Sequence, residues 1–242
     1  MNETELIYGK NAVIEVANFR RIHRVWATKA TYKKIRNYLS IDRTSLSIVS
    51  KAEINDISGR TDHQGIVASA DKYSFVGIDS LFYLSSGIIL ALDGITDPRN
   101  LGAIIRSSVL FGVDGIIIPR KNSSDITPVV CKASAGGTEH IAIARVESLM
   151  HTLNLFRERS FQIICADMPS EDSASIASFL PSNKLLVVMG SEDGLRKKVR
   201  TYSDIVVSIP QSSDFDSFNV SVAASIILWE LTQKKASFKL AL

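Results

Sequence analysis

The feature that most constrains this chain is a repeated order in its C-terminal half: a short apolar run, then a polar turn, then a helical pattern. The apolar runs are residues 88–92, 185–189 and 205–209. Apolar runs of this length, bounded by turn signals, are typical of strands buried on both faces. Strands that alternate with helices predict a parallel sheet, and the polar turns should then meet at its carboxyl edge, where open α/β sheets bind ligands.

Two further apolar runs extend this prediction. Residues 115–119 and 162–166 predict more strands of the same sheet, and residues 220–232 predict a last helix that is apolar nearly all round and mostly buried. The predicted fold class is therefore α/β. With 242 residues, of which 45% are hydrophobic, the chain has enough apolar material for two domains.

A smaller α/β unit is predicted before this sheet. Short helical and strand patterns alternate from Tyr8 to about Lys72, after which the character of the sequence changes. We therefore predict a first domain at residues 1–72, a linker with a short helix at residues 73–86, and a second domain at residues 87–242.

The first domain contains a basic segment in which Phe19, Trp26 and Tyr32 interleave with the charges. Only Glu15 and Asp42 oppose them. Positive charge attracts phosphates and aromatic rings stack on unpaired bases, so the segment suits an RNA contact surface as well as an ordinary solvated one. The basic residues are Lys10, Arg20, Arg21, Arg24, Lys29, Lys33, Lys34, Arg36 and Arg43.

Other classes of function lose support. The chain has neither the glycine fingerprint of dinucleotide-binding folds nor a phosphate-binding loop with Gly-Lys-Ser/Thr. Cys131 and Cys165 lie far apart and, like the four histidines, match no metal spacing, so we predict buried free thiols and no metal. No signal peptide or membrane-length apolar segment is recognisable, which favours a cytoplasmic protein.

Three motifs of the second domain resemble the SpoU family of RNA ribose 2′-O-methyltransferases, within the trefoil-knotted SPOUT superfamily. They are Asp-Pro-Arg-Asn-Leu-Gly-Ala at 97–103 with Arg-Ser at 106–107, the segment 186–195, and Ile-Pro at 209–210 with Ser-Phe-Asn-Val-Ser-Val-Ala at 217–223. The first domain, with its segments 8–13 and 63–66, is similar to the small ribosomal-protein-L30e-like domain that binds substrate in large-subunit rRNA guanosine methyltransferases.

The resemblance implies a trefoil knot at about residues 185–225, an S-adenosylmethionine pocket within it, and a homodimer. It implies that Gly190, Ile209 and Phe218 bind the cofactor. The residues that it implies for catalysis are Asn100, Arg106, Glu192, Ser217 and Asn219. A guanidinium stays protonated in proteins, so Arg106 suits a phosphate clamp or the stabilisation of a developing oxyanion better than proton removal. Both asparagines also suit helix caps.

The function implied is methylation of a ribose 2′-hydroxyl in ribosomal RNA, with a guanosine of the large subunit as the expected target. Two alternatives stay open: a tRNA ribose methyltransferase, and an RNA-binding assembly factor with impaired catalysis. The second arises because the 186–195 motif is one residue shorter than usual between Glu192 and Gly194. In addition, Gln211 to Ser213 stand where methionine and glycine are usual, and Ser213 would adopt a positive φ reluctantly.

Overall fold

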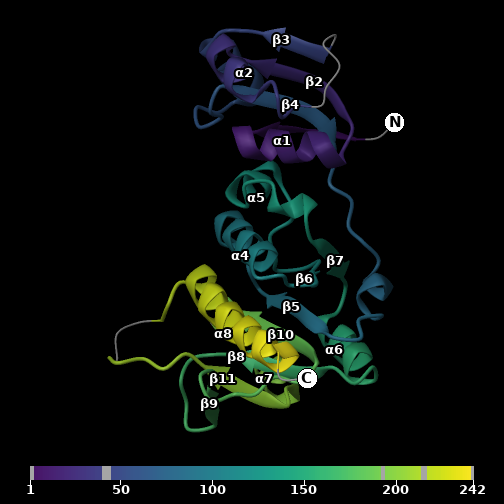
Figure 1. Cartoon of the computed structure of the whole chain (residues 1–242), viewed down its shortest axis with the longest axis vertical. Coiled ribbons are helices and arrows are strands. Elements are labelled where there is room, and N and C mark those ends of the chain that lie inside the picture. The colour runs from purple at the N-terminus through teal and green to yellow at the C-terminus, as the bar shows by residue number, and fades with distance from the viewer. Residues whose placement is uncertain (1–2, 40–44, 192–193, 214–216, 241–242) are drawn as a thin grey trace. The chain divides into compact units, whose positions relative to one another are not determined.

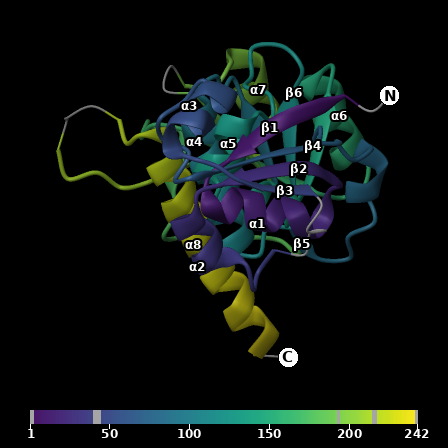
Figure 2. The same cartoon turned by 90° about the horizontal axis from the view of Figure 1, so that it is seen from above.

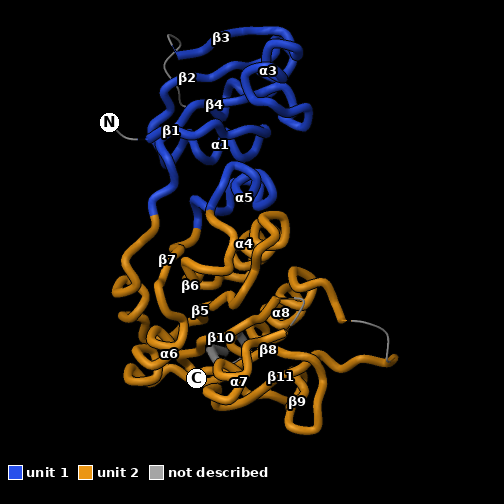
Figure 3. The backbone as a smooth tube through the Cα atoms, turned by 180° about the vertical axis from the view of Figure 1, so that it is seen from behind, with its two compact units in different colours: residues 1–74, 126–140 blue, residues 75–125, 141–242 orange. Residues whose placement is uncertain are grey.

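The computed structural model divides the chain into two compact units, coloured separately in Figure 3. Unit 1 comprises Met1–Ser74 and Ile126–His140, and unit 2 comprises Phe75–Asp125 and Ile141–Leu242. The segment Ile126–His140, which the sequence analysis includes in the second domain, therefore packs in unit 1. The structure describes residues 3–39, 45–191, 194–213 and 217–240, the last five of these as backbone only.

Unit 1 is built on a four-stranded sheet in the order β1-β4-β2-β3, which Figure 2 shows one strand beside the next. β4 is antiparallel to β1 and β2, whereas β2 and β3 are parallel. The strands are β1 (Thr4–Tyr8), β2 (Ile22–Ala27), β3 (Leu46–Ile48) and β4 (Ile66–Asp71). The helices are α1 (Lys10–Phe19), α2 (Lys29–Ile35) and α3 (Lys51–Ser58), with α5 (Pro128–Ala133) and the 3₁₀ helix η3 (Gly137–Glu139) from the inserted segment.

The inserted segment belongs to the core of unit 1. Helix α5 contacts β1, and Cys131 lies among buried residues such as Ile7 and Val13. Burial raises the pKa of the Cys131 thiol to about 12, and that of Cys165 in unit 2 to about 11. Both cysteines are free and buried, as the sequence predicts.

Unit 2 contains a seven-stranded sheet in the order β7-β6-β5-β10-β8-β11-β9, part of which faces the viewer in Figure 1. Every strand pair is parallel, which confirms the predicted sheet. The sequence predicts five of the strands, β5 (Gly87–Asp93), β6 (Gly115–Pro119), β8 (Gln162–Ala166), β10 (Lys184–Gly190) and β11 (Ile205–Ser208). It does not predict β7 (Ala142–Val146) and β9 (Ser173–Ser175).

All residues from Ile88 to Asp93 on β5 are buried, which indicates that helices cover both faces of this sheet. Leu149, Leu153 and Phe156 of α6 share a core cluster with Ile89. The helices are α4 (Pro98–Leu110), α6 (Leu149–Arg157), α7 (Lys197–Tyr202) and α8 (Val220–Leu240), and the 3₁₀ helix η2 (Ile78–Leu81) lies in the predicted linker.

Helix α8 packs on β10 and runs beside α4 in the same direction. The Oγ atoms of Ser107 and Ser225 are 2.8 Å apart, and the rings of Phe111 and Trp229 follow one turn later, at 6.1 Å between centroids. The apolar surface of α8 is less buried than the sequence predicts, since the Trp229 side chain is 52% exposed. None of the described helices is long and apolar enough to span a membrane.

Candidate functional site

The polar turns of unit 2 meet at the carboxyl edge of its sheet. Gly190 at the end of β10 pairs with Asp93 at the end of β5, and Met189 pairs with Ala166 at the end of β8. Because these strand ends are in register, the turns that follow them surround one region. Two pockets open there, and both are lined by Ser191, Gly194 and Val220.

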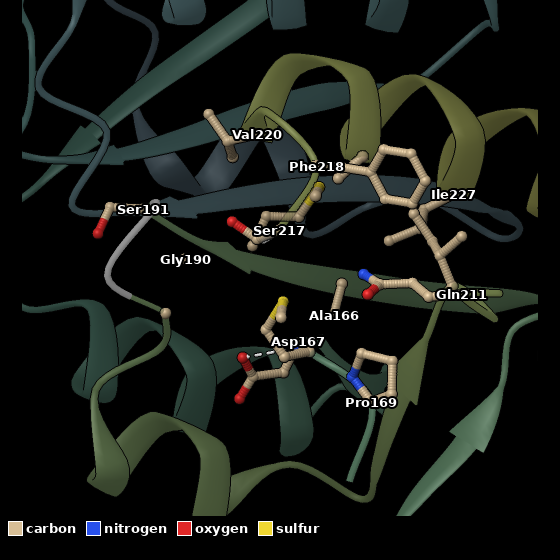
Figure 4. Close-up of a pocket in the computed structure, with 15 residues that line it drawn as sticks. Ala166, Asp167, Pro169, Gly190, Ser191, Gln211, Ser217, Phe218, Val220 and Ile227 are labelled. Carbon is tan, nitrogen blue, oxygen red and sulfur yellow. Dashed lines mark hydrogen bonds between the residues drawn. The ribbon is translucent and has the colours of Figure 1, made fainter. Parts of the chain in front are cut away.

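The apolar pocket has an empty volume of about 580 Å³, including the space at its mouth. Figure 4 shows its walls, which come from the turns after three strands and from the start of α8. They include Ala166–Pro169 after β8, Met189–Ser191 at the end of β10, Ile209, Gln211, Ser217 and Phe218 after β11, and Val220, Ala223 and Ile227 of α8.

Gly190 allows the backbone to close tightly at this pocket. A Cβ atom on Gly190 would lie 2.6 Å from the carbonyl carbon and oxygen of Gly194 and 2.8 Å from the nitrogen of Leu195. Gly194 itself has a φ of 83°, and its N–H donates to the carbonyl oxygen of Ser191 over 2.9 Å. The turn therefore requires glycine at both positions.

Asp167 is the charged side chain among the described residues that line the apolar pocket. Its Oδ1 accepts the N–H of Met168 at 2.9 Å, drawn as a dashed line in Figure 4, and its Oδ2 accepts from Arg200 at 3.1 Å. These two bonds hold a carboxylate in a cavity whose other described lining residues are uncharged.

The polar pocket is larger, with an empty volume of about 1290 Å³. Its wall includes Asp93, Asp97, Asn100, Lys121 and Arg196. The Asp93 side chain is 4% exposed, and its two oxygens accept from Nε and Nη2 of Arg196 at 2.9 and 2.6 Å. Such a bidentate pair fixes the plane of the guanidinium.

The predicted asparagines lie together. Asn219 Nδ2 donates to Asn100 Oδ1 over 3.1 Å, and Asn219 Oδ1 accepts the N–H of Ser221 at 3.0 Å, which caps α8. The predicted cap by Asn100 is wrong. Asp97 caps α4 by accepting the N–H of Arg99 at 2.8 Å, because Pro98 takes the first helical position and leaves Asn100 inside the first turn.

The other predicted residues have different surroundings. Gly190, Ile209, Ser217 and Phe218 line the apolar pocket, whereas Arg106 is exposed on α4 and lines neither pocket. Glu192 lies outside the described residues. Ser213 has no positive φ, so the backbone strain considered for it does not arise.

Comparisons with known proteins now define the family. The sequence model of the SpoU rRNA methylase family matches residues 87–229, and that described as RNA 2′-O ribose methyltransferase substrate binding matches residues 6–76. The chain belongs to the SpoU rRNA methylase family. Its place there makes it an RNA methyltransferase, and its two SpoU matches are separated by residues 77–86.

Relatives of known sequence and structure agree with the SpoU assignment. An uncharacterized tRNA/rRNA methyltransferase of Mycobacterium avium is 33% identical, with 96% of this chain and 78% of that protein covered. A Bacillus subtilis protein named for the TrmH family of tRNA/rRNA methyltransferases is 30% identical, with 96% of each covered. The SpoU methyltransferase AviRb of Streptomyces viridochromogenes, solved with the cofactor AdoMet, shares the fold with a TM-score of 0.80 and 21% identity, over 97% of this chain and 91% of that one.

The SpoU motifs did not identify every residue that the structure gathers at this edge. Asp167, Gln211, Asp93, Lys121 and Arg196 all line one of the pockets. A signal was present for two of them, because Asp93 ends the apolar strand β5 and Asp167 directly follows the apolar strand β8. Arg196 could not be paired with Asp93 from sequence, since 103 positions separate them.

Proposed function

We propose that this SpoU protein transfers a methyl group from S-adenosylmethionine to the 2′-hydroxyl of a ribose in ribosomal RNA, with a guanosine of the large-subunit RNA as the target and the cytoplasm as the site of action. The observation that carries the proposal is the apolar pocket, where the turns after three parallel strands meet and the backbone closes at Gly190. Ligands of α/β sheets bind at such strand ends.

The residues of the apolar pocket fit this cofactor. Phe218, Met189 and Ile227 supply an apolar wall for a flat adenine ring, and the turn at Gly190 brings backbone donors and acceptors close to it. The carboxylate of Asp167 also lines this pocket, and because Arg200 already balances its charge, it would serve the ligand as a hydrogen-bond acceptor. When bound, S-adenosylmethionine supplies a methyl group activated by its sulfonium.

The chain's own groups would hold the ribose. The paired amides of Asn100 and Asn219 lie at the neighbouring N-termini of α4 and α8, and Ser217 lines the apolar pocket beside them. We assign them to positioning of the ribose and its hydroxyl, because alignment alone can contribute about 7–11 kcal/mol to such transfers. Arg106 and Glu192 stay predicted participants, Arg106 as a stabiliser of charge and Glu192 as its partner or as a proton acceptor.

Unit 1 would bind the RNA. Arg21, Arg24, Lys33 and Lys34 are exposed on β2 and α2 or next to them, as a phosphate-binding surface requires. Tyr38 is 67% exposed and offers a ring for stacking. Arg20, by contrast, is withdrawn from this surface, because its side chain is 8% exposed and paired with Glu5 and Glu139.

We further propose the trefoil knot at about residues 185–225 and a homodimer. The dimer is supported by a group of apolar side chains exposed on α4 and α8, since exposed apolar patches mark contact sites. Leu110, Val222 and Trp229 have exposed fractions of 75%, 46% and 52%. Replacing Trp229 by Glu should give a monomer in light scattering, and an unchanged mass would contradict this interface.

The experiment that tests the function has two parts. Calorimetric titration with S-adenosylmethionine should show one site, and purified protein should add one 2′-O-methyl group to ribosomal RNA from cells that lack the gene. Transfer to tRNA instead would establish the tRNA alternative. Binding of RNA without binding of S-adenosylmethionine at millimolar concentration would favour the assembly factor.

A further inference from the structure

We infer that Arg196, held by the buried carboxylate of Asp93, binds a backbone phosphate of the target RNA in the polar pocket. This inference rests on the proposed methyl transfer to RNA and adds to it the subsite that places the target nucleotide. In this inference the arginine that contacts the substrate is Arg196 and not Arg106.

The two members of the pair differ in exposure, because Asp93 is buried and the guanidinium of Arg196 is accessible. Asp93 ends the buried strand β5 and is 4% exposed, whereas the Arg196 side chain is 61% exposed. Nε and Nη2 of Arg196 each contact one oxygen of Asp93, and the remaining N–H donors of the guanidinium bond to no described residue. Within the described part of the chain, no other acceptor bonds to Arg196.

The pocket around Arg196 suits an anion. Lys121 is exposed on the same wall, and its loop is held by the N–H of Ser124, which donates to the carbonyl oxygen of Ile95 over 2.7 Å. Of the lining carboxylates, Asp93 is paired with the charge of Arg196, whereas Asp97 accepts the backbone N–H of Arg99 and keeps its negative charge. Arginine forks match phosphate oxygens in bidentate geometry, and lysine adds a second positive charge.

The position of this pocket explains why a phosphate there would help catalysis. It shares Ser191, Gly194 and Val220 with the apolar pocket, so a group bound at Arg196 lies beside the cofactor site. In RNA the 2′-hydroxyl and the 3′-phosphate are carried by adjacent ribose carbons. An arginine that holds this phosphate therefore restricts where the hydroxyl can lie, and Arg196 acts through that phosphate while Asp93 is a positioning residue.

A carboxylate would be recognised by the same guanidinium, and the methionine end of the cofactor carries one. The two sources predict different measurements. A phosphate contact raises the KM for RNA and contributes to its salt dependence, whereas a cofactor contact raises the Kd for S-adenosylmethionine.

The test compares Arg196→Ala, Arg196→Lys and Asp93→Asn with the wild type in KM and kcat for RNA, in the Kd for S-adenosylmethionine, and in melting temperature. We expect Arg196→Ala to raise the KM for RNA on the order of tenfold or more, with the Kd for the cofactor within about twofold of wild type. The slope of log KM against log salt should fall by about 0.7–1, the value for one lost phosphate contact. Arg196→Lys and Asp93→Asn should raise KM less, since each keeps one positive charge without the fixed fork.

The matched control is Arg157→Ala. Arg157 also pairs with an aspartate, Asp204, at 2.8 Å, but it lines neither pocket, so its loss should leave KM and the salt slope unchanged. An unchanged KM in an active Arg196→Ala or Arg196→Lys enzyme, or a raised cofactor Kd with normal KM, would overturn the inference. Absence of methylation in the wild type would instead refute the proposed function. If Arg196→Ala melts early, Arg196→Lys decides the question.

Discussion

Two arginines of this protein, Arg20 in unit 1 and Arg196 in unit 2, are each held by carboxylates but in opposite surroundings. Arg20 is enclosed: its side chain is 8% exposed and bonds to Glu5, Glu139 and the carbonyl oxygen of Asp71. Burial alone would lower the pKa of Arg20, but the bonds and charge of Glu139 outweigh it and raise the pKa. Arg196 has one buried partner and a largely exposed guanidinium.

The difference shows how to distinguish charged side chains that stabilise the fold from charged side chains that can bind a ligand. A buried arginine whose three nitrogens all donate to protein acceptors has little left for a ligand, and removing a partner leaves an uncompensated charge. An arginine that is hydrogen-bonded along one edge of its guanidinium is held in a fixed orientation and keeps the donors of its other edge for a ligand. The same test of remaining donors applies to any charged side chain near a pocket.

The largest effect is expected from Glu139→Ala, which leaves Arg20 with Glu5 as its only charged partner among the described residues. The free energy of unfolding should fall by about 3 kcal/mol, the lower end for a broken buried pair. Urea unfolding followed by Trp26 fluorescence, with Trp229 replaced by Phe throughout, measures it. The control Glu3→Ala removes an exposed pair with Lys72 in the same unit, whose side chains are 78% and 53% exposed, and should cost much less. Equal losses in the two variants would remove the distinction drawn here.

A second prediction concerns the turn near Arg196. Gly190→Ala puts a methyl group against the backbone of Gly194 and Leu195, and overpacking of this kind costs about 1–3 kcal/mol. We expect the Kd for S-adenosylmethionine to rise by roughly 5- to 150-fold in calorimetry. The control is Gly77→Ala, because no atom lies within 4 Å of a Cβ at Gly77. Normal cofactor binding by Gly190→Ala would exclude this turn from the cofactor site.

A third prediction concerns the paired amides of Asn100 and Asn219, and it tests whether they only stabilise the fold or also position the substrate. Asn219→Ala removes both the cap of α8 and the bond to Asn100, and should cost about 1 kcal/mol of stability as well as activity. Asn219→Ser restores a capping oxygen but cannot reach Asn100. If Asn219 positions the ribose, the Asn219→Ser variant should have a melting temperature close to that of the wild type but a low kcat. A wild-type kcat in this variant would show that Asn219 acts only as a helix cap.

The smallest effect is expected at an exposed pair in unit 1. Hydrogen bonds from Arg60 and then Lys132 hold the pKa of Asp62 far below its usual range. A lowered pKa contributes stability that is fully present above the unfolded pKa, about 4, and is lost progressively as pH falls from there through the folded pKa. Since the Asp62 side chain is 48% exposed, Asp62→Asn should cost under about 1 kcal/mol at pH 7 and clearly less near pH 2 in thermal melts. A larger cost, equal at both pH values, would show that packing and not charge is lost.

The parallel sheet could be predicted because five of its strands are continuous apolar runs. The other two carry weaker signals: β7 contains Arg145, and β9 is the three-residue segment Ser173–Ser175. Their places depend on neighbours far along the chain, since β9 pairs with β11. Local pattern therefore predicted the centre of the sheet and missed two strands at its edges.

For the site, resemblance supplied what local physics could not. Gly190 comes from one motif and Ile209, Ser217 and Phe218 come from another, and all four line one pocket, although their roles stay predictions. The cap of α4 was readable in principle, because Asp followed by Pro is a strong helix start, and choosing Asn100 over Asp97 was an error of turn chemistry. The pairing of Asp93 with Arg196 needed the fold itself.

The chain crosses between the two units three times, after Ser74, Asp125 and His140. A recombination event that exchanged only the first 74 residues would therefore pack Ile126–His140 against a different sequence. The core contacts of Cys131 and the ion pair of Glu139 with Arg20 would then have to be replaced. Unit 1 is therefore not a simple N-terminal cassette. Changes in it should be accompanied, across descendants, by compensating changes in that distant segment.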